Sequence, residues 1–191
     1  MACAAPLPAH AANGLPIPRH GSYRGLGVGG FHRLHYCDWG RRDNPRVVVC
    51  VHGYSRHARD FDFLARALSA DFRVICPDLA GRGESDWLGT AMEYSFPQML
   101  ADLNVLLSRL DVTEVDWVGT SLGGLLGMYL AAQPGTPIRR LVMNDVGAFV
   151  LSDSLPPLPS LYFWDVWNKV RCPTMLLRGE HSKVFPQSVA E

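Results

Sequence analysis

Short apolar runs alternate along the chain with longer stretches in which apolar residues recur every three or four positions. The short runs predict strands at residues 31–39, 46–51, 72–78, 115–118, 138–145 and 173–178. The clearest helical stripe runs from Met99 to Leu110, behind Ser95 and Pro97, which are residue types that favour a helix start. Strands and helices alternating at this spacing are typical of right-handed βαβ units on a parallel sheet.

One predicted strand runs into the sequence Gly119-Thr120-Ser121-Leu122-Gly123, and an apolar run of helix length follows it. A serine between a strand and a helix lies on a sharp turn, where its hydroxyl projects beside free backbone N–H groups. Side chains at Gly119 and Gly123 would collide where the strand and the helix pack closely. We therefore predict a nucleophile elbow at Ser121. The alternative is a glycine- and serine-rich loop before a buried helix.

Composition narrows the class of protein without identifying a ligand. The 191 residues are 48% apolar and 10% aromatic, which suits one globular domain. The 18 basic and 18 acidic residues cancel, so charge indicates no nucleic-acid or anionic-membrane partner, and no apolar run approaches the ~20 residues of a membrane span. Five scattered cysteines favour free thiols in a reducing, cytoplasmic compartment. We expect a loose tail over residues 1–24 and a single core over residues 25–191.

Two motifs near the N-terminus have the residue types of ligand sites but lack the required context. Gly25–Gly30 spells Gly-x-Gly-x-x-Gly, but the following residues alternate like a strand, whereas a dinucleotide site needs a helix there. His32, His35 and Cys37 are metal-ligand types, but His32 and His35 fall on opposite faces of a strand. The sequence therefore predicts no cofactor and no metal.

Four separated residue groups resemble the α/β-hydrolase superfamily, in its esterase and C–C hydrolase-like branch. They are His52-Gly53, the loop 78–85, the elbow around Ser121, and residues 173–179. The resemblance implies an α/β fold with a mostly parallel sheet flanked by helices. It also implies that Ser121 is the nucleophile, that the N–H groups of Tyr54 and Leu122 form the oxyanion hole, and that the substrate is a small molecule with an ester or related acyl or C–C bond.

The acid and the base of the implied triad depart from the family pattern. The acid commonly follows the strand that matches residues 173–178, but here Lys183 stands at that place. Asp145, at the end of the preceding strand, and Glu180 are the substitutes, and we favour Asp145; a loop-capping aspartate is the alternative. His181 is the one histidine after Ser121 and hence the candidate base, although an exposed loop histidine is the ordinary interpretation. We expect His52 to shape its loop, since the triad runs serine, acid, histidine.

The chain also resembles a shortened hydrolase core. A proline-rich loop at residues 147–160 stands where the branch often inserts a helical cap, and the final strand with the family's histidine is not expected before Glu191. The sheet edge left free in this way would allow self-association. Two functions follow: a serine hydrolase acting through Ser121, or a non-catalytic α/β-hydrolase-like protein or binding module.

Overall fold

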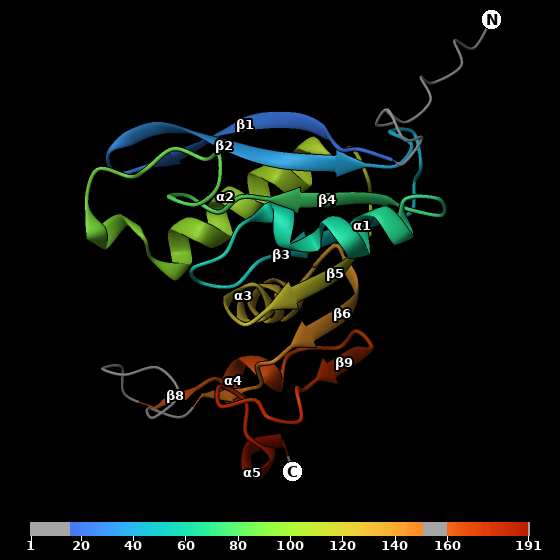
Figure 1. The fold of residues 1–191 in the computed structure, drawn as a ribbon. Coiled ribbons are helices and arrows are strands. Elements are labelled where there is room, and N and C mark those ends of the chain that lie inside the picture. Colours follow the sequence, from blue (N-terminus) through green and yellow to red (C-terminus); the bar gives the residue numbers. More distant parts are fainter. Residues whose placement is uncertain (1–15, 151–159, 191) are drawn as a thin grey trace, which may run out of the picture.

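The computed structural model describes residues 16–150 and 160–190 of the chain, and its main layer is a seven-stranded sheet with the order β1-β2-β4-β3-β5-β6-β9 (Figure 1). The strands are β1 (Arg19–Gly27), β2 (Gly30–Trp39), β3 (Val47–Val51), β4 (Arg73–Pro77), β5 (Val115–Thr120), β6 (Ile138–Asn144) and β9 (Thr174–Leu177). β2 is antiparallel to both β1 and β4, and every other pair is parallel. The mostly parallel sheet expected from the sequence is confirmed.

The apolar runs predict every strand of this sheet except β1. β1 pairs with β2 from Arg19 to Gly27, so residues 19–24, which the sequence assigns to the tail, belong to the sheet. The strand carries little apolar signal because it passes close to bulky neighbours. A Cβ atom added to Gly21 would lie 2.3 Å from the Tyr36 ring, and one added to Gly25 would lie 2.3 Å from the Asp102 carboxylate. The Gly25–Gly30 motif thus forms a hairpin, with no helix after it.

Helices cover both faces of the sheet. α2 (Phe96–Arg109) and α3 (Leu122–Ala131) pack on one face, and α1 (Asp62–Leu68), which follows the 3-10 turn η1 (Ala58–Phe61), packs on the other (Figure 1). The shorter helical elements are η2 (Ala91–Glu93), α4 (Trp164–Trp167) and α5 (Gln187–Ala190). None of the helices in the described ranges combines the length and the apolar character of a membrane-crossing segment.

The start of α2 shows how the sequence sets a helix boundary. The Ser95 hydroxyl accepts a hydrogen bond from the Gln98 backbone N–H at 3.4 Å, and Pro97 lies in the first turn. The Gln98 side chain does not hydrogen-bond the backbone of Ser95, the residue that caps the helix. It donates instead to Leu26 O and to the Asp102 carboxylate, so it joins α2 to β1.

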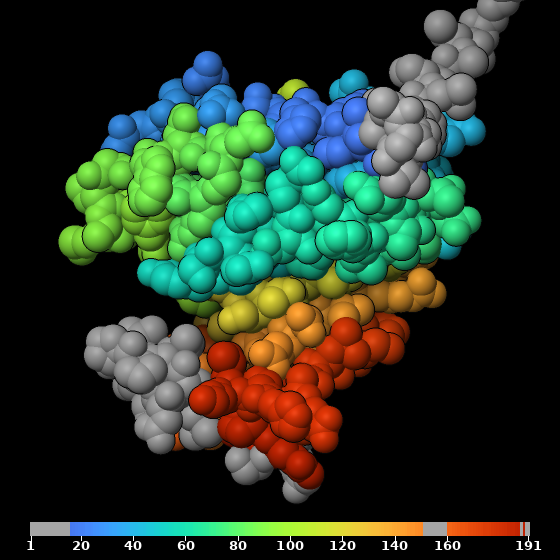
Figure 2. All heavy atoms as spheres, in the orientation of Figure 1, coloured from blue at the N-terminus to red at the C-terminus, as the bar shows by residue number. Residues whose placement is uncertain are grey.

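Burial falls steeply toward one edge of the sheet. β3 and β4 are buried along their whole length, whereas in β9 Met175, Leu176 and Leu177 are 57%, 40% and 44% exposed. Figure 2 shows the C-terminal residues gathered at the end of the molecule opposite β1 and β2. β9 is the last strand of the sheet order, so one of its edges pairs with no other strand among the described residues.

A second, two-stranded sheet begins within residues 147–160, the stretch expected to be a loop, and ends just after it. β7 (Phe149–Val150) pairs with β8 (Leu161–Tyr162), and the rings of Phe149 and Tyr162 stack with their centroids 4.6 Å apart. Residues 151–159, which hold most of the predicted proline-rich loop, lie outside the described residues. The pair was missed because two-residue strands are too short to show alternation.

Candidate active site

Ser121 occupies the turn between β5 and α3 in a strained backbone conformation, with φ 50° and ψ −114°. A non-glycine residue in such a conformation costs of order 1–3 kcal/mol, so the surroundings must hold it there. The Ser121 N–H donates to Asn144 O at 2.9 Å, and the Ser121 carbonyl accepts from the N–H groups of Gly124 and Leu125. The serine therefore lies at the carboxyl end of the parallel strands, where α/β sheets bind their ligands.

The flanking glycines are required by contacts between backbone atoms. A Cβ atom on Gly119 would lie 2.2 Å from Gly123 O, and one on Gly123 would lie 2.0 Å from Val51 O. Below them the fully buried Trp117 donates from Nε1 to Gly123 O at 3.0 Å, which joins β5 to the first turn of α3. The close approach of strand and helix predicted from the sequence is confirmed.

The loop after β3 lies against this turn. A Cβ atom added to Gly53 would stand 3.7 Å from the Cβ of Ser121. Within the described ranges, the backbone N–H groups of Tyr54 and Leu122 donate no hydrogen bond. N–H donors without an acceptor that lie near a serine can stabilise negative charge on an oxygen that they reach.

His52 shapes this loop, as the sequence predicts, and its ring has no free nitrogen. Nε2 accepts a hydrogen bond from the Leu79 N–H at 3.1 Å, so the ring proton is on Nδ1, which donates to Gly53 O at 2.7 Å. Burial lowers the pKa of His52, which favours this neutral form. The imidazole therefore supports the loop beside Ser121 and is not available as a base.

Asp145 lies next to the elbow because β5 and β6 are parallel neighbours, with Thr120 paired to Asn144. It follows β6 with φ 60°, and its N–H donates to Leu177 O at 2.7 Å. Its Oδ1 accepts a long, 3.5 Å hydrogen bond from the Gly179 N–H. The structure therefore brings Asp145 together with the loop after β9.

Glu180 and His181 lie in that loop and are exposed. The Ser182 N–H donates to Gly179 O at 3.0 Å, and Arg178 donates to the carbonyl groups of Gly179 and Glu180. In the part of the chain that the structure describes, neither the Glu180 carboxylate nor the His181 ring makes a hydrogen bond, and no histidine is hydrogen-bonded to the Ser121 hydroxyl. The serine side of the predicted site is assembled, and the acid–base side is not joined to it.

Residues 46–170 match the family described as alpha/beta hydrolase fold. The chain belongs to the α/β-hydrolase family. It is 52% identical over 130 residues to the 3-hydroxybutyrate-oligomer hydrolase of Cupriavidus necator, covering 68% of this chain and 44% of that protein. It is 35% identical over 167 residues to the cis-3-alkyl-4-alkyloxetan-2-one decarboxylase of Shewanella oneidensis, covering 86% and 49%.

The fold of this α/β-hydrolase is also seen in solved structures. A putative hydrolase from Rickettsia typhi superposes with a TM-score of 0.83, covering 90% of this chain and 86% of that one, and at 21% identity it shows the fold alone. The chain spans about half the length of the two curated relatives, at 44% and 49% of their residues.

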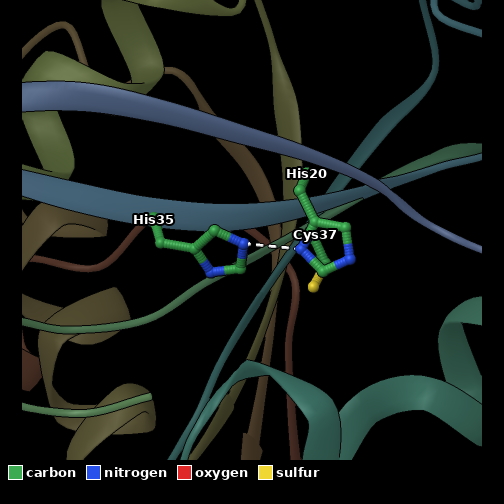
Figure 3. A group of neighbouring side chains, drawn as sticks. All are labelled: His20, His35 and Cys37. Carbon is green, nitrogen blue, oxygen red and sulfur yellow. Dashed lines mark hydrogen bonds between the residues drawn. The ribbon is translucent and has the colours of Figure 1, made fainter. Parts of the chain in front are cut away.

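A cluster of metal-ligand residue types lies on β1 and β2 and consists of His20, His35 and Cys37 (Figure 3). His20 pairs with Cys37 across the two strands, and His35 is two residues before Cys37, so all three face one side of the sheet. Their potential ligand atoms lie within 4.8 Å of one another. His32 faces the other side, where its Nε2 lies 3.0 Å from the Asp102 carboxylate, so the predicted separation of His32 and His35 is confirmed.

Contacts within the protein account for this cluster. His35 Nδ1 lies 2.7 Å from Asp78 Oδ2, and its Nε2 lies 2.8 Å from His20 Nδ1. Burial raises the pKa of the Cys37 thiol to about 12, which disfavours the thiolate that a metal would need. The hydrogen bonds of this group therefore connect β2 to the loop that begins at Asp78.

Asp78 is the central acceptor of these hydrogen bonds. Its carboxylate accepts hydrogen bonds from the N–H groups of Ala58 and Glu84, at 2.7 and 3.0 Å, besides its contact with His35. Burial alone would raise the pKa of Asp78, but these hydrogen bonds outweigh it and lower the pKa. Gly83 packs on the carboxylate so closely that an added Cβ atom would lie 2.2 Å from it. The loop 78–85 is consequently held in place beside Tyr54.

Sequence reasoning missed an open cavity of about 500 Å³ between this loop and Tyr54. Its walls include Tyr54, Arg56, Arg82, Trp87 and Tyr94. These residues come from two loops without hydrophobic periodicity, so no pattern in the sequence brings them together. The one available signal in the sequence is Arg82, a large charged residue within a glycine-rich loop.

Proposed function

We propose that the protein is a serine hydrolase that cleaves an ester or a related acyl bond through Ser121. The observation that carries the proposal is the strained turn of Ser121 beside the unoccupied N–H groups of Tyr54 and Leu122. The relative from Cupriavidus necator is named for hydrolysis of 3-hydroxybutyrate oligomers, which supports an ester as the substrate. Short oligoesters of hydroxy acids are therefore the substrate class that we propose.

The proposed reaction begins with attack of Ser121 Oγ on the ester carbonyl carbon, and the hydroxyl proton passes to a base. The carbonyl electron pair moves onto the oxygen, where the N–H groups of Tyr54 and Leu122 stabilise the negative charge. Collapse of this intermediate breaks the bond to the alcohol, which leaves with a proton, and water then hydrolyses the acyl-serine. Loss of one oxyanion donor typically lowers the rate on the order of 10²–10³-fold.

We propose Asp145 as the acid in preference to Glu180. Asp145 follows the strand next to Ser121 and contacts Gly179, whereas the exposed Glu180 carboxylate makes no hydrogen bond within the described residues. His181 is the candidate base in this chain because it lies two residues after Gly179. For that role the turn 179–182 must bring its ring within hydrogen-bond reach of Ser121 Oγ.

A non-catalytic α/β-hydrolase-like protein is the second candidate function. The observation that favours it is the lack of a hydrogen bond between the Ser121 hydroxyl and any histidine in the described part of the chain. Such a protein would keep the fold and the cavity beside Tyr54 but would bind a ligand without cleaving it.

A fluorescent fluorophosphonate separates the two candidates, because it reacts with serines that a base activates. We expect labelling of the wild type, loss of labelling in Ser121→Ala, and full labelling of the matched control Ser108→Ala, which changes an exposed serine on α2. Loss of labelling in a folded His181→Ala variant would support His181 as the base. Absence of both labelling and ester hydrolysis in the folded wild type would overturn the enzyme proposal.

We also infer a reducing, cytoplasmic compartment. Cys37, Cys50 and Cys76 are buried free thiols, and Cys172 is also free. Proteins of oxidising compartments more often use their cysteines in disulfides. Fractionation of the source cells with an antibody against the protein would test this, and recovery outside the cytoplasm would contradict it.

A further inference from the structure

The cavity beside Tyr54 carries an uncompensated positive charge. Two arginines line it, and no acidic side chain does so among the described residues. Arg56 is paired with Asp60, with 3.1 Å between its Nη2 and the carboxylate, so its charge is compensated. Arg82 forms no ion pair with a carboxylate in residues 16–150 or 160–190.

The Arg82 guanidinium is held in one orientation. Its Nε donates to Tyr54 O at 3.0 Å, and its Nη1 donates to Ala80 O at 2.7 Å. It also lies over two aromatic rings, 5.1 Å from the Tyr54 centroid and 5.6 Å from the Tyr94 centroid. Its Nη2 donates no hydrogen bond within the described residues, so donors remain for a ligand. A group that is already oriented loses little conformational entropy when a ligand binds.

Arg82 contacts the same residue that offers an N–H group beside Ser121. The Tyr54 carbonyl accepts from Arg82, while Gly53, one residue earlier, lies against the Ser121 side chain. Figure 2 shows the segment that follows β4 next to the segment that follows β3 on the same side of the molecule. A substrate whose reacting carbonyl lies at the Tyr54 N–H could therefore extend its other end into the cavity.

We propose that this cavity is a carboxylate subsite, in which Arg82 binds the free acid end of an ester substrate. Trp87, which is 80% exposed, and Tyr94 would pack against the carbon chain next to that carboxylate. Arginine suits this role because its planar fork matches the two oxygens of a carboxylate. The inference rests on the proposed hydrolase function and specifies its substrate as an ester that keeps a free carboxylate.

The test compares the linear dimer of 3-hydroxybutyrate as the free acid with its methyl ester, in which a neutral ester replaces the terminal carboxylate, and follows cleavage of the ester bond between the two units. For the wild type we expect kcat/KM to be about tenfold or more higher for the acid, mainly through a lower KM. Arg82→Met keeps the apolar stem and removes the charge. It should lower kcat/KM for the acid by about 10- to 100-fold, the size of a lost charged hydrogen bond, and change that for the methyl ester less than about threefold.

Arg59→Met is the matched control, because Arg59 lies nearby on η1, pairs with Asp62 and does not line the cavity. It should leave the preference for the acid unchanged. The methyl ester serves as an internal control for the Tyr54 loop, which Arg82 also supports, since a displaced loop would slow both substrates equally.

The outcomes separate the subsite from the hydrolase function. Failure of the folded wild type to cleave either dimer would contradict the proposed function. Equal kcat/KM for the two wild-type reactions, or an equal loss for both in Arg82→Met, would overturn the subsite alone. If Arg82→Met does not fold, the two dimers are compared by titration calorimetry as ligands of the Ser121→Ala variant. The free acid should bind at least about tenfold more tightly than its methyl ester. Equal binding would overturn the subsite.

Discussion

The two halves of the sheet's carboxyl edge differ in how firmly hydrogen bonds and burial hold their loops. On the side of β3, β4 and β5, buried groups hold Ser121, the Tyr54 loop and the Asp78 loop through short hydrogen bonds. On the side of β6 and β9, the Asp145 carboxylate accepts one long hydrogen bond, and the turn that carries His181 is exposed. The comparison shows that local packing around a turn can position a serine, whereas a base for that serine would have to be positioned by contacts between distant segments.

The largest expected difference between the two sides comes from adding one methyl group to a glycine of each. In Gly123→Ala the new Cβ atom would lie 2.0 Å from Val51 O, and both atoms belong to tightly packed backbone, so we expect a loss of more than about 4 kcal/mol or failure to fold. In Gly179→Ala the nearest atom is 3.8 Å away, so the free energy of unfolding should change by less than about 0.5 kcal/mol.

Urea unfolding followed by tryptophan fluorescence measures both variants. Gly179 lies in the loop that holds Glu180 and His181, which makes its variant the matched control for the elbow. Similar stabilities of the two variants would show that the elbow is not the more tightly packed side.

A second comparison uses two residues that are neighbours in register on adjacent strands. Met143 of β6 is fully buried, and Leu176 of β9, its partner, is 40% exposed. Truncation of a buried methionine leaves a cavity, so Met143→Ala should cost about 3 kcal/mol, whereas Leu176→Ala should cost less than about 1 kcal/mol. Equal costs in the same urea experiment would indicate that β9 is covered in solution.

The same division explains what could be predicted from the sequence. The elbow was predictable because its constraint is local: a strand, two glycines and an apolar helix stand next to one another around Ser121. The buried strands were predictable because runs such as residues 47–51 are apolar throughout. β1 was not predictable, because Gly21 and Gly25 are required by close contact with the side chains of Tyr36 and Asp102, which are distant in the sequence.

The site beyond the elbow depends on distances that no local pattern contains. The contact of Arg82 with Tyr54 joins residues 28 positions apart through a side chain and a carbonyl group, so neither strand alternation nor helix periodicity reveals it. Asp145 could be named from its place at a strand end, but whether His181 reaches Ser121 depends on how an exposed turn packs. The acid and the base therefore stay predictions.

The buried Asp78 provides a test of the hydrogen bonds that support the elbow side. Its pKa in the folded protein lies below its ordinary value of 3.8, so its ionised form stabilises the fold above that value, and this stabilisation is lost as the pH falls through the folded pKa. Asp78→Asn should therefore cost about 2 kcal/mol at pH 7 and much less in acid. Unfolding free energies measured in urea between pH 7 and the acid limit of folding would show this convergence.

Asp102 is the matched control because it is also buried against a histidine, His32, at 3.0 Å. Burial raises the pKa of Asp102 despite that contact. Folding therefore favours its protonated form, and the resulting penalty grows as the pH rises above the unfolded pKa. The cost of Asp102→Asn should then be smaller at pH 7 than that of Asp78→Asn, and the reverse order would contradict the opposite roles of the two carboxyl groups.

The smallest expected effect on the monomer concerns the outer edge of β9. An edge strand with exposed apolar side chains is a template for pairing with another chain, so we expect wild-type protein to form a concentration-dependent dimer through β9. Met175, at 57% exposure, is suited to test this, because a charge on an edge strand opposes pairing while costing an isolated fold less than about 0.5 kcal/mol. Met175→Lys should lower the dimer fraction in size-exclusion chromatography with light scattering, and Val105→Lys, at 40% exposure on α2, should not. A wild-type protein that stays monomeric over the whole concentration range would contradict the expected dimer. The difference in burial between the two sides of the sheet would then be a property of the single chain.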